Sequence, residues 1–552
     1  MKLKSILTTL IVAGMVSTIF TGCGSDSKKD QTPVTLTESG TFPIVPEGEE
    51  LVIDIFAPLR SGVTTYVREN NTMTQKFEDK TGLTINWSEV PNADRVQKLN
   101  SVMQSGLYPD VILDHWWSKS EQQLYADQGI LIPIEELIAE HAPHIQAVLD
   151  KYPLVKQNMT LDDGHIYAIP ALDTTPQTGA NYKMWINQVW LDNLGLEMPT
   201  TLDEFTEVVR KFRDEDANGN GDPNDEIALT SSFKSWNSNT MYFLLNSFTY
   251  YAAHNKFMYI DDNGKLVYTR TSDEFKEGVK YLNSLFEEGL LDETAFTQDT
   301  NALKQIGNNP GENILGACAG GYLGSFLNIG DSDRWTEFSP VAPLVGPEGV
   351  QYAIANPALG NAVLSITSEC PSPEAVIRAW DLFFYNETND FGIYNFAGEE
   401  GIDYVLASEG DLNAIGEPAT YTRLTGNNDR DGRYWNQLGP MYKAEDFLIR
   451  YTVEGDGDAE TTLHQITLDN YTPYLPDDSM ILLPMAFGTD ESRELIDIET
   501  ALNSYFDMTF AEFVTGKLDI DENWDEYVAE LEKIGLSRYI EIYQNKLDST
   551  RN

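Results

Sequence analysis

The stretch LVIDIFAPLRSG, residues 51–62, decides the fold together with KTGLTINW (80–87) and PDVILDHWW (109–117). Short apolar runs at 51–56, 83–87 and 109–113 predict three strands. The segments between them, 71–80 and 95–104, have apolar residues at helical spacing, and each is followed closely by a glycine, Gly82 and Gly106. Strand, helix, strand, helix, strand predicts an α/β fold around an open, mostly parallel sheet.

Ligands of such sheets bind beyond the carboxyl ends of the strands, where loops diverge. Two loops occupy that position here, 58–62 with Arg60 and 114–117 with four consecutive candidates. Neighbouring tryptophans in a polar loop are hard to bury together, so we expect at least one ring to face a cleft. The alternative is one buried anchor beside one incidental surface ring. The candidates of the second loop are Asp114, His115, Trp116 and Trp117.

The N-terminus predicts export. Lys2 and Lys4 precede an apolar run over 6–20, and two small residues lead directly into Cys23. This order indicates a lipoprotein signal peptide, residues 1–22, with cleavage before Cys23 and lipid attached to its thiol. Residues 23–50, rich in Ser, Thr, Gly, Pro and charge, predict a flexible tether. The alternative is a plain signal peptide or a membrane anchor with an incidental cysteine.

Composition limits the partners. With 552 residues, of which 41% are hydrophobic and 11% aromatic, the chain is long enough for two globular lobes. Its net charge is −50, and no basic cluster follows the leader, so we expect no nucleic-acid partner. Membrane contact is expected through the lipid alone. Two further cysteines, Cys318 and Cys370, either pair or stay as buried free thiols.

An acidic loop follows the helix predicted over 202–213. It reads DEDANGNGDPNDE, residues 214–226, and alternates oxygen-bearing side chains with glycine, as calcium loops do. One register starts at Asp214 with Gly219 at the tight turn. The preferred register places Gly221 there instead, and an acidic turn without an ion is the alternative to both. The preferred ligands are Asp216, Asn218, Asn220, Asp222, Asp225 and Glu226.

Six segments together resemble the extracellular solute-binding protein family 1, which includes the sugar-binding lipoproteins of ABC importers. They are PDVIL (109–113), DQGILIPI (127–134), DGHIYAIP (163–170), WINQVWLDNLGL (185–196), PTTLDEF (199–205) and FAGEEGIDY (396–404). The last is similar to a stretch of the family's large branch, which also holds alginate-oligosaccharide binders. The resemblance implies a non-enzymatic, monomeric protein on the outer face of the membrane, with permease subunits as partners.

The implied architecture is the type II fold of periplasmic binding proteins, two α/β lobes that close on ligand about a hinge. Each lobe is expected to carry a mostly parallel sheet flanked by helices. We assign residues 51–168 and about 314–370 to the first lobe. Residues 169–313 and 371–552 are assigned to the second lobe.

A sugar cleft needs aromatic platforms beside polar groups, because sugar rings combine apolar faces with hydroxyl edges. Candidates outside the first-lobe loops are Trp236, Asn237, Tyr250, Tyr322, Tyr394 and Trp435. The family topology places Trp116, Trp236 and Tyr322 at the cleft. The acidic body favours a neutral oligosaccharide, with an acidic oligosaccharide or a peptide as alternative ligands.

Two other classes of function remain, an extracellular glycoside hydrolase and a carbohydrate-binding surface adhesin. The sequence has neither a Gly-x-Ser-x-Gly elbow nor a His-Glu-x-x-His zinc motif. With 87 acidic residues, some pair of carboxylates always looks plausible for a glycosidase. Binding without catalysis is therefore the preferred interpretation.

Overall fold

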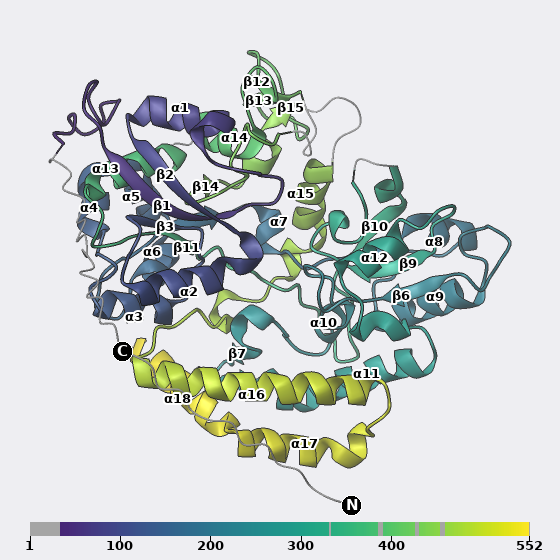
Figure 1. Cartoon of the computed structure of the whole chain (residues 1–552). Helices are drawn as coiled ribbons and strands as arrows, with labels where there is room; N and C mark the ends of the chain where they lie inside the picture. The colour runs from purple at the N-terminus through teal and green to yellow at the C-terminus, as the bar shows by residue number, and fades with distance from the viewer. Residues whose placement is uncertain (1–33, 330–332, 385–389, 425–429, 453–458, 551–552) are drawn as a thin grey trace, which may run out of the picture.

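The computed structural model describes residues 34–329, 333–384, 390–424, 430–452 and 459–550. The predicted signal peptide, Cys23 and the start of the predicted tether lie outside the described residues. Two lobes stand side by side, and the C-terminal helices run beneath both of them (Figure 1). None of the described helices combines the length and the apolar composition that a membrane span requires.

The first lobe is built on a six-stranded sheet. Its strands follow the order β14 (Tyr442–Lys443), β4 (Ile169–Asp173), β11 (Asn361–Ile366), β3 (Val111–Leu113), β1 (Val52–Leu59) and β2 (Thr84–Pro91). The strands β2, β1 and β3 are parallel, as the alternation of strand and helix predicts. The β11 strand runs antiparallel to both of its neighbours. The flanking helices are α1 (Thr72–Thr81), α2 (Arg95–Ser105), α3 (Lys119–Asp127), α4 (Glu135–His141), α5 (Pro143–Lys151), α6 (Pro153–Met159), α13 (Pro373–Asp381) and α14 (Asp390–Ala397).

The second lobe contains a four-stranded sheet in the order β10 (Phe338–Val341), β5 (Met184–Asn187), β9 (Leu315–Ala319) and β6 (Ile227–Thr230). Only β6 and β9 are parallel, so this sheet is mixed where we expected a mostly parallel one. The second lobe also contains a hairpin of β7 (Met258–Ile260) and β8 (Leu266–Tyr268). Its helices are α8 (Gln188–Leu194), α9 (Leu202–Asp214), α10 (Thr240–Leu245), α11 (Asp273–Glu287) and α12 (Thr300–Gly307).

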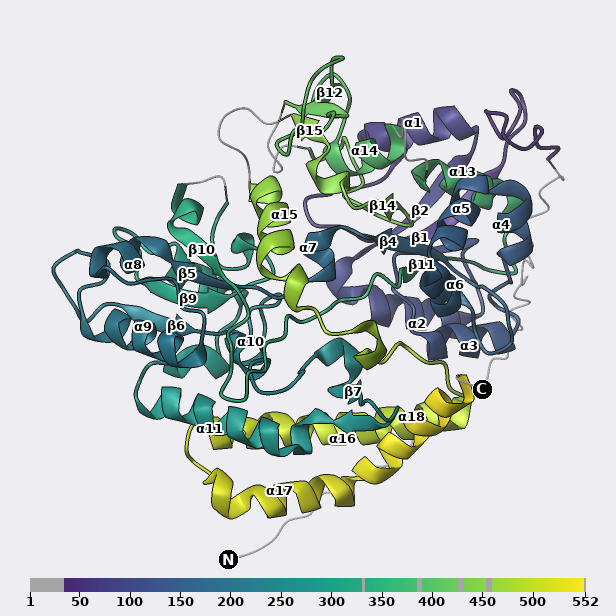
Figure 2. The same ribbon diagram turned by 180° about the vertical axis from the view of Figure 1, so that it is seen from behind.

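Three C-terminal helices cover the lower side of the second lobe, and the view from behind shows α11 lying along them (Figure 2). They are α16 (Thr489–Val514), α17 (Ile520–Ile534) and α18 (Leu536–Thr550). Their apolar residues belong to the second-lobe core, as the assignment of the C-terminus predicted. Two contacts join them to the first lobe: Ser120 and Ser492 share a hydrogen bond of 3.0 Å, and Lys546 pairs with Asp162 at 2.9 Å.

The lobe boundaries differ from the predicted ones. We assigned residues after 370 to the second lobe, yet α13, α14 and residues 434–447 pack into the first-lobe core. Conversely, β9 and β10 belong to the second sheet, although we assigned the region from 314 to the first lobe. Both assignments were wrong because strand partners far apart in sequence are set by tertiary packing, which local periodicity does not report.

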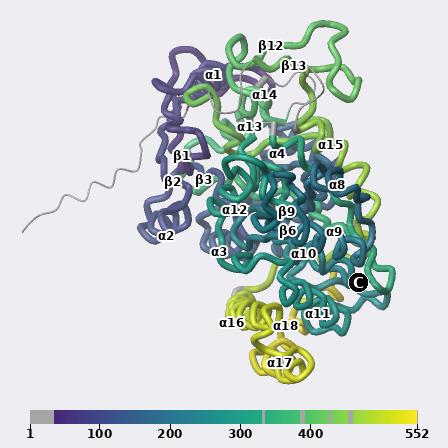
Figure 3. The backbone as a smooth tube through the Cα atoms, turned by 90° about the vertical axis from the view of Figure 1, so that its right-hand side faces the viewer, coloured from purple at the N-terminus to yellow at the C-terminus, as the bar shows by residue number. Residues whose placement is uncertain are grey.

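A small sheet projects from the first lobe at the end opposite the C-terminal helices (Figure 3). It consists of β12 (Tyr404–Leu406), β13 (Tyr421–Arg423) and β15 (Tyr451–Thr452). Between the lobes lie α7 (Pro176–Gly179) and α15 (Ala459–Asn470), which contact each other. The α/β fold with two lobes is therefore confirmed.

The expected tether is shorter than predicted at its described end. Ile44 is fully buried, and its backbone N–H donates to the carbonyl of Thr81 at 2.7 Å. Arg378 holds the preceding turn by donating to the carbonyl oxygens of Thr37, Glu38 and Thr41. The chain therefore packs on the first lobe before Glu50, because these apolar and backbone groups find partners there.

Candidate functional site

A charged network fixes the tryptophan that follows β3. Arg60 Nη1 lies 3.0 Å from Asp114 Oδ2, and the other carboxylate oxygen accepts a 3.0 Å hydrogen bond from Trp116 Nε1. Arg60 Nε donates to the carbonyl of Asn436 at 3.2 Å. The indole is thus held in one orientation while 51% of Trp116 stays exposed. Such an oriented, exposed ring is suited to stacking against an apolar ligand face.

The Arg60 charge is already used within the protein. Asp114 is buried, and burial raises the pKa of its carboxyl while the Arg60 guanidinium opposes that shift. Removing the cation would leave a buried carboxylate without its counter-charge, which is costly. Arg60 therefore serves to hold Asp114 and is not a free cation for an acidic ligand.

The second lobe presents its own exposed tryptophan, Trp236, which is 59% exposed. Its ring lies directly on the backbone of Gly321, because a Cβ built there would come within 2.5 Å of Trp236 Cζ3. Ser325 Oγ donates to the Trp236 carbonyl at 3.2 Å, and Asn237 Nδ2 donates to the Asn181 carbonyl at 2.9 Å. Among the described tryptophans, Trp116 and Trp236 are the two that are more than half exposed.

Backbone strain collects in the same loops. The left-handed region is adopted by Asp114 (φ 55°), Trp116 (φ 63°), Asn237 (φ 50°), Asn436 (φ 49°) and Gln437 (φ 63°). Each such residue costs about 1–3 kcal/mol and persists only where the surroundings fix it. Asp114, Trp116 and Asn237 belong to the loops of the two exposed tryptophans, whereas two further left-handed residues, Lys256 and Phe257, lie outside these loops.

Several predicted ligand residues are core residues instead. Trp435 is completely buried and packs edge-on against Phe77 and Trp87, with ring centroids 5.3 Å and 5.5 Å away. Tyr250 and Tyr394 are likewise buried. The structure therefore places these three side chains in the core and not on an open surface, because aromatic residues in loops still pack inward where the core has room for them.

The other predicted residues differ in how far they are exposed. Trp117 and His115 are buried against each other with centroids 4.4 Å apart, so the loop holds one exposed ring and one anchor, the alternative left open above. Tyr322 is half-buried against the cluster around Trp185. Cys318 and Cys370 do not form a disulfide with each other, and Cys318 lies buried in the second-lobe sheet.

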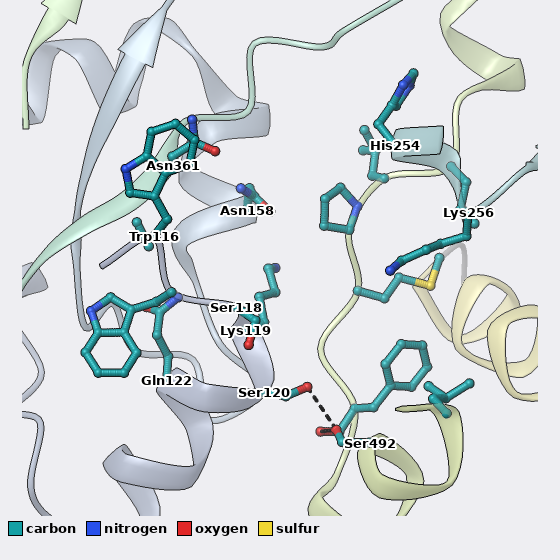
Figure 4. Close-up of a pocket in the computed structure, with 18 of the residues that line it drawn as sticks. Trp116, Ser118, Lys119, Ser120, Gln122, Asn158, His254, Lys256, Asn361 and Ser492 are labelled. Atoms are coloured by element: carbon teal, nitrogen blue, oxygen red, sulfur yellow. Dashed lines mark hydrogen bonds between the residues drawn. The ribbon is translucent and has the colours of Figure 1, made fainter. Parts of the chain in front are cut away.

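A cavity of about 430 Å³ opens beside Trp116, between the first lobe and the segment that leads into α16 (Figure 4). We call it the Trp116 cavity. Its apolar part includes Pro484, Met485 and Ile496, and its polar lining residues were not predicted from the sequence. They include Lys119, Gln122, Asn158, His254, Lys256, Asn361 and Glu499. They come from five separate segments, so no local pattern connects them.

The acidic loop after α9 is folded around its own side chains. Gly221 has φ 94°, and its N–H donates to Asp216 Oδ2 at 3.0 Å. Asn218 Nδ2 donates to Asp225 Oδ1 at 3.1 Å, and Asn220 Nδ2 donates to Asp225 Oδ2 at 2.7 Å. Gly219, the turn residue of the other register, is also left-handed with φ 75°, so both turns are present and the register that starts at Asp216 stays a prediction. Asp214, the start of the other register, instead pairs with Arg213 at 2.6 Å.

Two carboxylate oxygens test whether the loop suits a cation. Asp216 Oδ1 and Glu226 Oε2 are buried without a hydrogen-bond partner in the described part of the chain. Burial raises the pKa of Glu226, with the neighbouring Asp225 charge adding to the rise. The described residues contain no group of three His, Cys, Asp or Glu side chains arranged to hold a metal. A calcium site here would need amide and carbonyl oxygens as well, which asparagines and backbone supply.

Comparisons with known proteins agree with this architecture. The fructooligosaccharide ABC transporter substrate-binding protein FusA of Streptococcus pneumoniae serotype 4 is 29% identical over 99% of both chains. The solved structure of a FusA EF-hand mutant with fructo-nystose is 25% identical, covers 91% of this chain and 99% of its own, and has a TM-score of 0.73. The solved structure of an HMO-binding solute-binding protein of Bifidobacterium longum infantis ATCC 15697 is 22% identical. It covers 90% of this chain and 99% of its own, with a TM-score of 0.76.

The family model of bacterial extracellular solute-binding proteins matches residues 65–387. This range includes both exposed tryptophans, both lobe sheets except β1 and β14, and the acidic loop. Since the match covers more than half of the 552 residues, the chain belongs to the bacterial extracellular solute-binding protein family.

Proposed function

We propose that the chain is the substrate-binding component of an ABC importer and captures an oligosaccharide between its lobes. The observation that carries the proposal is the pair of exposed, fixed tryptophans, Trp116 on the first lobe and Trp236 on the second. Sugar rings stack on such platforms through their C–H faces. FusA, a relative over the whole chain, is named as a fructooligosaccharide-binding protein, which supports the same ligand class.

A neutral oligosaccharide is the proposed ligand. The body carries a net charge of −50, and Arg60, the cation nearest Trp116 in the network above, is paired with Asp114. An acidic ligand would be repelled by the body and would have to compete with a buried carboxylate for that guanidinium. A neutral chain needs neither charge.

The surrounding biology follows from the same proposal. Cleavage before Cys23 and lipidation of its thiol would anchor the protein at the extracytoplasmic face of the membrane. Transporter permease subunits would receive the ligand-loaded monomer. The loop over 214–226 would bind a structural calcium ion, supported by the Gly221 turn, the two orphaned oxygens and the EF-hand named in FusA. Calcium would there neutralise carboxylates that otherwise repel one another.

Calorimetric titration of the purified protein with neutral and acidic oligosaccharides tests the proposal, with Trp236→Ala as the diagnostic variant. A neutral oligosaccharide should bind the wild type and lose affinity at least ten-fold in the variant. Product analysis after prolonged incubation should show the sugar intact, which separates binding from glycoside hydrolysis. Exclusive binding of peptides or uronic-acid oligomers would refute the ligand class, and sugar cleavage would refute the non-enzymatic function.

A further inference from the structure

Residues 34–45, which we call the strap, pack on the first lobe although they lie in the stretch predicted to be a tether. Ile44 and Val45 are buried in the first-lobe core, and Val34, Leu36 and Phe42 pack against it. The strap lies at the edge of this lobe beside α1 and α13, on the side away from the second lobe (Figures 1 and 2). Burial of these apolar side chains offsets the entropy lost when the segment is ordered.

Arg378 of α13 holds the strap backbone. Its side chain is 3% exposed, and Nη1 donates to the carbonyl of Thr37 at 2.7 Å. Nη2 donates to the carbonyls of Glu38 and Thr41, at 3.0 Å and 3.1 Å. Within the described residues, all hydrogen bonds that this guanidinium makes outside α13 go to the strap. Because hydrogen bonds from an ionised donor are stronger than neutral ones, Arg378 fixes the turn over 37–41.

The end of α1 forms a close seat for the other half of the strap. The backbone N–H groups of Ile44 and Val45 both donate to the carbonyl of Thr81, at 2.7 Å and 3.1 Å. A Cβ built on Gly82 would lie 2.5 Å from the Val45 carbonyl oxygen and 3.2 Å from Pro43 Cβ. The strap can therefore approach this closely only because residue 82 is a glycine.

We propose that the strap docks the tether onto the first lobe and thereby sets how far the body can move from the membrane. Val34 lies 11 positions after Cys23, the proposed lipidation site, and Leu51 lies 28 positions after it. At about 3.5 Å per extended residue, the docked strap limits the reach to about 40 Å, against about 100 Å for the whole predicted tether. This inference rests on the lipid anchor of the proposed function and adds its length and the lobe that carries it.

A docked strap has two consequences for an anchored binding protein. Once a flexible linker is long enough to span two partners, their effective concentration falls roughly as the −3/2 power of its length. Extending the link from 11 to 28 residues would therefore lower the effective concentration of the body at a membrane partner about four-fold. The anchor also acts through the first lobe, so it places no direct restraint on the second lobe when the lobes close on ligand.

The test releases the strap in two ways, with Arg378→Met, which removes the guanidinium, and with Ile44→Ser, which removes the buried side chain. Arg210→Met on α9 is the matched control, because it removes an ion-paired arginine far from the strap. Glutamyl endopeptidase then reports release directly, since the carbonyl of its cleavage site, Glu38, is the one that Arg378 holds. Neutron reflectometry of the lipidated full chain on a supported phosphatidylcholine bilayer gives the separation of body and membrane. Thermal melting shows that each variant is folded.

Both strap variants should be cleaved after Glu38 at least ten-fold faster than the wild type, with the control unchanged. Their mean separation from the bilayer should rise from about 18 Å to about 29 Å, as flexible linkers of 11 and 28 residues predict. Unchanged cleavage and separation in folded strap variants would overturn the proposal and leave the lipid anchor standing. Equal binding of Cys23→Ser and wild type to the bilayer would instead overturn the anchor, and with it the reach that the strap is proposed to set.

Discussion

Gly321→Ala should lower the affinity for ligand by displacing the neighbouring Trp236 ring. A methyl group at this position would lie 2.5 Å from Trp236 Cζ3, 2.8 Å from Trp236 Cε3 and 2.8 Å from the Asn181 carbonyl oxygen. Ordinary contact between these atoms needs about 3.5 Å or more. The ring must therefore shift by about 1 Å, because the backbone carbonyl of Asn181 cannot move as easily as an exposed side chain.

The cost should fall on the ligand platform more than on stability. Overpacking of a rigid core costs about 1–3 kcal/mol, but Trp236 is 59% exposed and can tilt into solvent. We therefore expect unfolding free energy to fall by less than about 1 kcal/mol. When the Trp236 ring tilts, its flat face no longer lies against the ligand. The loss of one aromatic contact of about 1.5 kcal/mol lowers affinity roughly ten-fold.

Calorimetric titration with a neutral oligosaccharide and urea unfolding measure the two effects separately. Gly488→Ala is the control, since a Cβ there meets nothing within 4 Å and its φ of −59° suits alanine. Trp236→Ala defines complete loss of the platform. Unchanged affinity in a folded Gly321→Ala variant would refute the view that contact with Gly321 positions the Trp236 ring for ligand.

Three further experiments address the rest of the molecule. Calcium should raise the melting temperature of the wild type and have no effect on the double variant Asp216→Ala, Asn220→Ala, through binding to the native state alone; an unresponsive wild type would show that the loop is an ordinary turn. Burial lowers the pKa of Lys183 from 10.5 to about 7, so the unfolded chain binds more protons between these values and stability rises with pH. The difference in unfolding free energy between Lys183→Met and wild type should therefore be about 2 kcal/mol smaller at pH 9 than at pH 7 in urea titrations, and an equal difference would contradict it. Cys23→Ser should release the protein from membranes into the medium, and a variant that still sediments with membranes would disprove the lipid anchor.

Local signals predicted the first half of the first lobe well. The Asn71 side chain accepts from the backbone N–H of Thr74 and starts α1, and Gly82 ends it with φ 74°. Gly106 ends α2 in the same way with φ 73°. These ends were predictable because capping and glycine conformations act within one helical turn. The parallel pairing of β1 with β2 and β3 then follows from short crossover helices.

Long-range pairing was not predictable by the same means. The strand β14 has only two residues, and it joins the first sheet by pairing with β4 about 270 positions earlier. Nothing in Tyr442 or Lys443 marks that partner. Lys443 Nζ also binds Asp173 at 2.7 Å, so a partly buried charge pair stabilises the contact. Such pairings depend on where the whole chain leaves a strand edge open.

In the candidate site, too, some features were predictable from the sequence and others depend on long-range packing. The polar loop after β3 predicted that at least one of its two tryptophans is exposed, and the family resemblance placed Trp116 and Trp236 at the cleft; both rings are exposed. Trp435 stands in a loop as well, but Tyr66, Phe77 and Phe383 surround it with a core that sequence does not display. The polar lining of the Trp116 cavity had no signal at all, because its members meet only after both lobes and α16 are in place.

The charges near the site explain how so acidic a protein can offer a neutral pocket. Arg60 is paired with Asp114 and Lys256 with Glu499, so these charges compensate each other beside the ligand, and Lys119 is a further cation in the cavity lining, while the net −50 is carried by the molecule as a whole. A neutral sugar experiences no net force from that field, whereas an anion would be repelled over about a Debye length, roughly 10 Å at 0.1 M salt. Affinity for the neutral ligand should therefore stay constant when ionic strength is raised, as calorimetry in added sodium chloride would show. A steep salt dependence would mean that an ion pair with the ligand carries the binding, and the neutral site would have to be abandoned.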